Sequence, residues 1–82
     1  MANTDASGLG SKKARETILN SISRTGYSVE EFANHFEIPI QTLFCWIKGK
    51  RYPREYIANL ISRLVLEEEA RGVYRNSREN DE

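Results

Sequence analysis

The stretch over residues 28–48 carries two short helical patterns almost in contact, and this spacing limits the possible folds more than any other feature. Ser28 and Glu31 stand three apart, as in a capping box, which marks the start of a helix. The apolar residues that follow lie on one helical face: Val29, Phe32, Ala33 and Phe36. Pro39 ends this helix, because the residue before a proline avoids the α region, and opens the next. So short a connection predicts a sharp helix-turn-helix corner.

Helical patterns also flank this unit on both sides. Ser11 can cap a helix that ends at Gly26, and its apolar residues lie four apart: Ala14, Ile18 and Ile22. The helix opened by Pro39 runs to about Lys48 and ends at Gly49. Its apolar face holds Leu43, Trp46 and Ile47. Pro53 stands at the first position of the longest helix, which ends near Gly72 and has a wide apolar stripe: Tyr56, Ile57, Leu60, Ile61, Leu64 and Val65. The sequence therefore predicts an all-α fold of four helices.

Length and composition fit a single small domain. The chain has 82 residues, 39% of them hydrophobic and 29% charged, and it lacks the roughly 18 consecutive apolar residues of a membrane span. We expect a flexible arm over residues 1–10, a domain over residues 11–71 and a polar tail over residues 72–82, although Val73 and Tyr74 can still dock. Cys45 cannot form an internal disulfide, and no signal peptide is recognisable, so we expect a cytoplasmic protein.

Charge is segregated along a chain whose formal net charge is zero. Residues 11–26 hold four cations against one acid, a sum of +3, and residues 39–54 hold four cations and no acid, a sum of +4. Residues 67–82 hold six acids and three arginines. No global basic excess points to a nucleic acid, but the local pattern favours contacts with anions at residues 39–54.

The order of these residues carries a resemblance to a known family. The stretch VEEFANHFEIPIQTLFCWIK over residues 29–48, followed by GKRYP, resembles the helix-turn-helix motif of the Xre/Cro/phage-repressor family, and the similarity covers about residues 15–66. Ala33 matches the small residue that lets the two helices touch. The family's buried positions fall on Phe32, Phe36, Ile38, Leu43 and Trp46. The resemblance implies a compact lambda-repressor-like domain that binds double-stranded DNA sequence-specifically, as a transcriptional repressor of phage or mobile-element type.

Two places depart from the family pattern. Glu37 stands where the family usually has glycine at the turn, and a left-handed conformation costs a non-glycine residue roughly 1–2 kcal/mol. Phe44 and Cys45 stand where the family usually carries polar side chains that face DNA. Both departures touch the surface on which function would depend.

The resemblance also suggests which residues meet DNA. It assigns base contacts to Ile40, Gln41, Thr42 and Cys45. The Gln41 amide can pair bidentately with adenine, although Gln41 and Thr42 can instead satisfy free amides at the helix start. We expect phosphate contacts from Lys48, Lys50, Arg51 and Arg54, with Lys12, Lys13 and Arg15 as a weaker group. A solvated basic face is the alternative for these cations.

A dimer is expected because one short helix reads only a few base pairs. The last helix is more broadly apolar than one helix needs, and its dimer surface is predicted at Leu64, Val65 and Leu66. The C-terminal tail can instead cover that excess.

A second class of function remains open on the same scaffold. Phe44 and Cys45 on the recognition helix, together with the zero net charge, favour a protein-interaction module such as an antitoxin-like or inhibitor protein. Catalysis is not expected, because there is no phosphate-binding loop, no cluster with metal-ligand spacing and one histidine, His35, which we place on the surface. We expect no cofactor and no metal.

Overall fold

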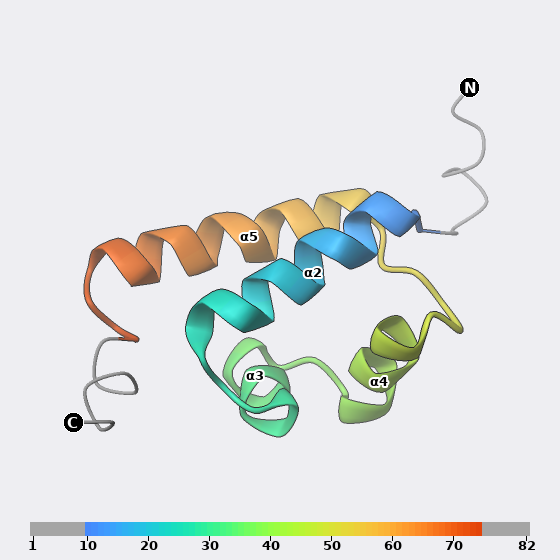
Figure 1. The fold of residues 1–82 in the computed structure, drawn as a ribbon, viewed down its shortest axis with the longest axis horizontal. Helices are drawn as coiled ribbons and strands as arrows, with labels where there is room; N and C mark the ends of the chain where they lie inside the picture. The colour runs from blue at the N-terminus through green and yellow to red at the C-terminus, as the bar shows by residue number, and fades with distance from the viewer. Residues whose placement is uncertain (1–9, 75–82) are drawn as a thin grey trace.

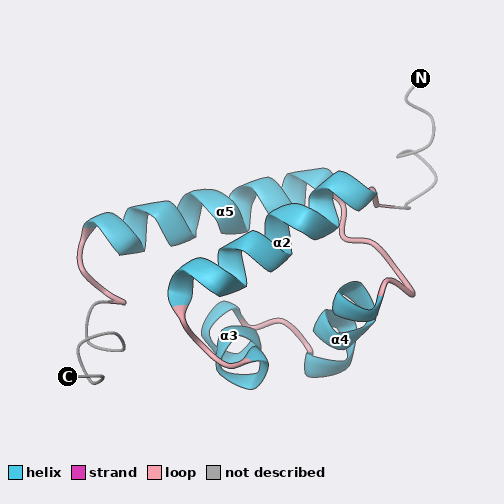
Figure 2. Cartoon of the chain, viewed as in Figure 1, coloured by secondary structure: helices cyan, strands magenta, loops and turns pink. Residues whose placement is uncertain are grey.

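The computed structural model describes residues 10–74, and within them the chain forms four helices. These are α2 (Lys12–Thr25), α3 (Val29–Phe36), α4 (Ile40–Lys48) and α5 (Glu55–Ala70). The described residues contain no strand (Figure 2). The predicted all-α fold of four helices is confirmed. None of the described helices is long and apolar enough to cross a membrane.

The two long helices form one layer, and the two short helices lie beneath it. α5 packs chiefly on α2, and the two run side by side, while α3 and α4 lie together below them (Figure 1). The core fills the space between these layers with ten buried residues: Ala14, Ile18, Phe32, Ala33, Leu43, Trp46, Ala58, Ile61, Val65 and Tyr74. Burial of each large apolar side chain contributes about 1.5–3 kcal/mol to folding. All four helices supply part of this core, so none of them folds independently of the rest.

Local signals set the helix ends much as predicted. The Ser11 hydroxyl accepts a hydrogen bond from the amide of Ala14 at 3.0 Å, and Ser28 and Glu31 form both hydrogen bonds of the capping box. Gly26 and Gly49 adopt the left-handed conformation that ends α2 and α4.

The two prolines lie slightly earlier than predicted. Pro39 is the N-cap of α4, not its first helical residue, because its ψ of 132° is extended; its carbonyl accepts from Leu43 at 3.1 Å. Pro53 precedes Arg54, the N-cap of α5. Each proline therefore sets the direction of entry into a helix and lies outside it.

The folded domain is longer than the predicted range 11–71. At its start, the backbone of Gly10 runs so close to Pro53 that an added Cβ would lie 1.8 Å from the Pro53 carbonyl oxygen, so this position admits only glycine. At its end, Tyr74 is 3% exposed and belongs to the core. The remainder of the predicted arm and tail, residues 1–9 and 75–82, lies outside the described residues.

Candidate nucleic-acid interface

α4 presents one face to the core and the opposite face outward. Leu43 and Trp46 are buried, whereas Gln41, Phe44 and Lys48 are exposed. Because successive helical residues are rotated by about 100°, the three exposed residues share one side of the helix. Cys45 is half-buried beside them. We call these four residues the α4 outer face.

The structure brings only part of the predicted base-reading set onto this face. Gln41 and Cys45 belong to it. Ile40 is half-buried and packs against the core, and Thr42 is half-buried and lies on the side of α4 away from Phe44. Phe44, expected as a mark of protein binding, lies between Gln41 and Lys48 with 41% of its surface exposed. Any partner that covers the outer face therefore contacts the Phe44 ring.

The turn between α3 and α4 keeps a left-handed residue although no glycine is present. Glu37 has φ 58° and ψ 42°, and the amide of Ile38 donates to the carbonyl of Ala33 at 2.8 Å. Ala33 is 2% exposed, and its small side chain lets the two helices approach. The departure at Glu37 is thus absorbed as local backbone strain, and the corner itself is retained.

Arg15 fixes the far end of α4 from another helix. Its Nε donates to the carbonyl of Trp46 at 2.8 Å, and its Nη2 donates to the carbonyl of Ile47 at 2.7 Å. These carbonyls belong to the last turn of α4, where helical partners run out and a cation is favoured. Arg15 therefore joins α2 to α4 and does not belong with the phosphate-facing cations. A periodic pattern cannot reveal such a contact, because the partners are backbone atoms more than thirty residues away.

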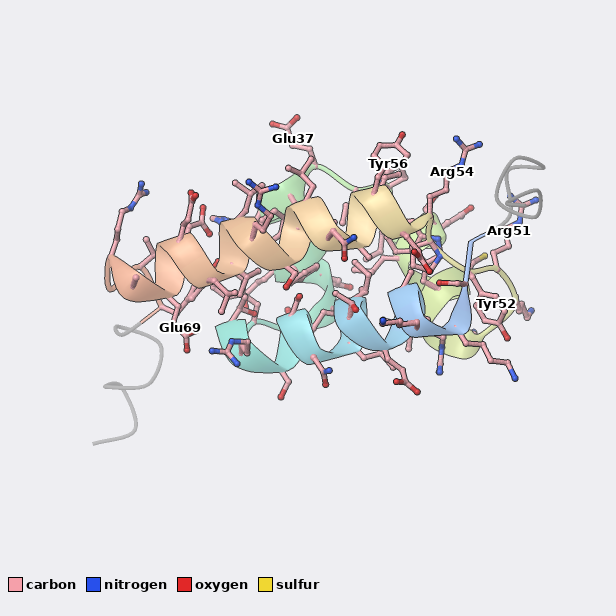
Figure 3. The ribbon with its side chains drawn as sticks, turned by 90° about the horizontal axis from the view of Figure 1, so that it is seen from above. Glu37, Arg51, Tyr52, Arg54, Tyr56 and Glu69 are labelled. Carbon is pink, nitrogen blue, oxygen red and sulfur yellow. The ribbon has the colours of Figure 1, made fainter. Side chains whose placement is uncertain are left out.

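Two cationic segments that lie far apart in the sequence meet at one end of the molecule. The amide of Ser11 donates to the carbonyl of Pro53 at 3.2 Å, and its hydroxyl donates to Glu55 at 3.0 Å. This contact joins the start of α2 to the loop after α4, where Arg51 and Arg54 extend outward (Figure 3). We call the exposed cations gathered here the basic end: Lys12, Lys13, Lys48, Lys50, Arg51 and Arg54.

The cations of the basic end form no salt bridge within the described part of the chain. The two salt bridges among the described residues lie at the C-terminal end of α5, away from the basic end. They join Arg24 to Glu69 at 2.8 Å and His35 to Glu68 at 2.9 Å. Unpaired, exposed cations beside two helix N-termini create a region of positive potential. The basic end is therefore suited to contact with an anion.

Glu68 connects three parts of the fold at the opposite end. Its Oε1 accepts hydrogen bonds from the Tyr74 hydroxyl and from His35 Nε2. Burial raises the pKa of the Glu68 carboxyl, but these two hydrogen bonds, together with the electrostatic attraction of His35 and Arg71, outweigh it and leave the pKa below its ordinary value. Burial and the bond to Glu68 raise the pKa of Tyr74. Tyr74 is thereby held against the core.

His35 contributes to an aromatic cluster as well as to the salt bridge. Its ring makes edge contacts with Tyr27 and Phe36, at centroid distances of 5.3 and 4.7 Å. A shallow hollow of about 350 Å³ lies beside it, lined by Tyr27, Glu31, Asn34 and His35. Among the described residues there is no group of three metal-ligating side chains.

The predicted dimer surface is corrected by the structure. Val65 is fully buried, whereas Leu64 is 37% and Leu66 is 47% exposed. Three consecutive helical residues point about 100° apart, so Leu64 and Leu66 lie on different sides of α5, with Val65 facing the core between them. These three residues cannot form one surface.

No known protein family matches this chain, and neither do the curated proteins or the solved structures that were compared with it. The α4 outer face and the basic end remain the features from which a function can be argued.

Proposed function

We propose that this chain binds double-stranded DNA sequence-specifically and acts as a transcriptional regulator of the Xre/Cro/phage-repressor type, most simply as a repressor. The observation that carries the proposal is the position of the basic end directly beside the α4 outer face. Double-stranded DNA presents a matching surface: base edges in the major groove for the α4 outer face, and phosphates along the groove for the basic end.

In the proposed complex, the N-terminal part of α4 enters the major groove. Gln41 is the exposed amide on this turn and pairs with adenine, a contact worth about 1–3 kcal/mol of discrimination. Phe44 and Cys45 supply apolar contacts, for which the thymine methyl group is a partner. Lys48, at the end of the same face, reaches the groove wall.

The basic end holds the phosphate backbone in this complex. Its cations come from two segments that meet at one end of the molecule, so they can contact neighbouring phosphates beside the inserted helix. Contacts of this kind release counterions, and the affinity must therefore fall steeply with salt. We further propose that the chain works as a homodimer in the cytoplasm, by binding and without catalysis, cofactor or metal.

The proposal is tested by titrating the isotopically labelled protein with a generic DNA duplex, at low and at physiological salt. We expect amide shifts concentrated in residues 39–54 that weaken as salt rises. In a companion titration, Lys50→Ala should weaken binding to all sequences and flatten the salt slope, whereas Gln41→Ala should relax sequence preference with little loss of nonspecific affinity. No shifts in residues 39–54 at low salt would refute the proposal.

One observation favours a second candidate, a protein-interaction module of antitoxin-like or inhibitor type. The 41% exposure of Phe44, at the centre of the outer face, suits a protein partner. Replacement of Phe44 and Cys45 by serine separates the two candidates. A DNA-binding protein should keep most of its affinity for DNA, because the phosphate contacts of the basic end are unchanged, whereas a protein-binding module should lose its partner.

A further inference from the structure

The hollow of about 350 Å³ at the start of α3 takes no part in the α4 outer face or the basic end. It is lined by Tyr27, Glu31, Asn34 and His35. Tyr27 precedes α3, and the other three residues lie three or four positions apart within it, so they share one side of that helix. Ligand sites typically have volumes of about 300–1,000 Å³. A shallow hollow at the lower end of this range suits the end of one side chain.

Two aromatic rings form part of its wall, and neighbouring contacts hold them in place. The rings of Tyr27 and His35 meet at 63°, with centroids 5.3 Å apart. Tyr74 packs edge-on against Tyr27 at a centroid distance of 5.3 Å, while Glu68 binds both Tyr74 and His35. The face of a tyrosine ring attracts cations. The wall is therefore ordered before any ligand arrives.

Glu31 supplies a carboxylate that the start of α3 already positions. Its Oε1 accepts a hydrogen bond from the amide of Ser28 at 3.1 Å, as part of the capping box. Its Oε2 makes no hydrogen bond within the described part of the chain, and neither does the side-chain amide of Asn34 one turn later. Both side chains are exposed. The hollow thus offers two oxygen acceptors on one side of α3.

The charge around the hollow favours a cation. Residues 27–37 hold three acids and neither lysine nor arginine: Glu30, Glu31 and Glu37. Burial, with the negative charges of Glu68 and Glu31, raises the pKa of the Tyr27 hydroxyl. Two arginines near this end are already beside acids: Arg24 beside Glu69, and Arg71 beside Glu68. A cation that enters the hollow therefore meets an excess of negative charge.

We propose that this hollow binds the guanidinium group of an arginine side chain that a partner protein presents. A guanidinium is planar and carries its N–H donors in a fixed fork. It can stack on the Tyr27 ring and donate to Oε2 of Glu31 and to the amide oxygen of Asn34, while the Ser28–Glu31 bond stays intact. A free amino acid would instead bring its own carboxylate close to Glu31.

The site goes beyond the proposed function. The turn between α2 and α3, where Tyr27 lies, is at the other end of the molecule from the loop after α4 (Figure 1). The hollow is therefore separate from the basic end, which carries the proposed contacts with DNA.

Tripeptide probes and the isotopically labelled full chain test the proposal by NMR. The probe is Gly-Arg-Gly with both ends blocked, and the control peptide has citrulline, which has a similar shape but no charge, in place of arginine. We expect amide shifts concentrated in residues 27–35, with a dissociation constant on the order of 1 mM for arginine and one about tenfold higher for citrulline. Equal binding of the two peptides, or shifts only outside residues 27–35, would overturn the proposal.

Two adjacent acids of α3 give a matched pair of variants. Glu31→Gln removes the charge at the hollow but keeps the capping box, because glutamine can also accept from the Ser28 amide. It should raise the dissociation constant of the arginine peptide about fivefold. Glu30→Gln removes the same charge from a side chain that does not line the hollow, so it should change the constant less than about twofold. Equal effects of the two variants would refute a specific role of Glu31.

The aromatic wall is tested at Tyr27. Tyr27→Phe keeps a ring and should bind the arginine peptide about as well as wild type, whereas Tyr27→Leu should bind it about threefold more weakly. Circular dichroism verifies that both variants are folded. Leucine as good as phenylalanine at this position would contradict recognition of the cation by the ring.

Two further measurements identify the source of the arginine. Arg75 and Arg78 follow Tyr74 in the sequence. If the double variant Arg75→Ala and Arg78→Ala bound the arginine peptide about tenfold more tightly than wild type, the chain's own arginines would be the occupants and the partner would be excluded; equal affinity supports a partner. Free L-arginine should bind more weakly than the peptide, and tighter binding would also overturn the proposal. None of these measurements uses DNA, so their outcome is independent of the proposed function.

Discussion

At the scale of single residues, Glu37 carries the clearest local cost in the fold. Among the described residues it is the one non-glycine residue with a positive φ, and the turn between α3 and α4 depends on it. Glu37→Gly should raise the free energy of unfolding by about 1 kcal/mol, because glycine adopts the left-handed region without the penalty that a Cβ imposes. Urea denaturation measures the change.

The control for Glu37 is alanine. Glu37→Ala keeps the Cβ, so it should not share the gain seen with glycine. If both variants were equally stabilised, the cause would be removal of the carboxylate and not relief of backbone strain. The location of this strain was predictable from sequence, since the helix-turn-helix pattern that the sequence resembles has glycine there, but only the dihedral angles reveal that the turn is retained.

At the scale of elements, Arg15 determines how α4 is held against α2. Arg15→Met should lower the free energy of unfolding by about 1–3 kcal/mol, because it leaves the carbonyls of Trp46 and Ile47 without their charged donors. Hydrogen exchange should speed up most in α4. Arg15→Lys keeps the charge but lacks the forked geometry, so it should recover only part of the loss. Uniformly faster exchange over all four helices would contradict a role specific to α4.

The contact among α3, α5 and the turn after α5 should depend on pH through Glu68. Because its folded pKa is lowered, Glu68 contributes stability that is present above its ordinary pKa of about 4.3 and is lost as pH falls through the folded value. Wild type should therefore lose its advantage over Glu68→Gln as urea denaturation is repeated at lower pH. A constant difference between the two proteins from pH 7 to pH 3 would show that the charge of Glu68 is not what stabilises the contact.

Tyr74 should make the stability of the same contact depend on pH in alkaline solution. Its pKa is raised in the folded state, so its contribution is complete below its ordinary pKa of about 10 and is lost as pH rises through the folded value. Tyr74→Phe should be less stable than wild type at neutral pH, and the difference should shrink in alkaline solution. Thermal unfolding at pH 7 and above pH 10 tests this. A difference that grows with alkalinity would contradict it.

Sequence patterns predicted the elements because their signals are local. The Ser28 capping box and the glycines after α2 and α4 act within a few residues, and each was found where expected. The contacts of Arg15 and Tyr74 were not predictable, because their partners are brought near only by the fold. The grouping of Leu64, Val65 and Leu66 into one dimer surface was wrong for a related reason. A wide apolar stripe does not reveal which of its residues face the core, and Val65 lies in the core.

At the scale of the whole molecule, the described residues hold cations without salt bridges at one end of the long layer and salt-bridged side chains at the other. The basic end gathers six exposed cations from two segments, whereas Glu68 and Glu69 lie at the far end of α5. The cations of residues 48–54 were predicted as one group from sequence alone. Their union with Lys12 and Lys13 depends on the contact of Ser11 with Pro53, which no pattern in the chain reveals.

Position, and not net charge, should therefore control DNA affinity. Arg51→Glu and Arg71→Glu change the net charge equally, but Arg51 lies in the basic end and Arg71 follows α5 at the other. In the proposed complex, Arg51→Glu should weaken binding at least tenfold at low salt and reduce the salt slope, whereas Arg71→Glu should change the affinity less than twofold. Fluorescence anisotropy with a labelled duplex measures both. Equal losses would show that only the total charge matters.

The fold separates the outer face of α4 from the contact that joins the two long helices. α3 and α4 are an excursion between two helices that pack on each other and whose starts are tied together by Ser11. Gln41, Phe44 and Lys48 face outward from α4, so they take no part in the contact between α2 and α5. Substitutions at these positions can therefore change binding specificity while the fold stays intact. A library randomised at these three positions should consist of folded variants that bind different ligands.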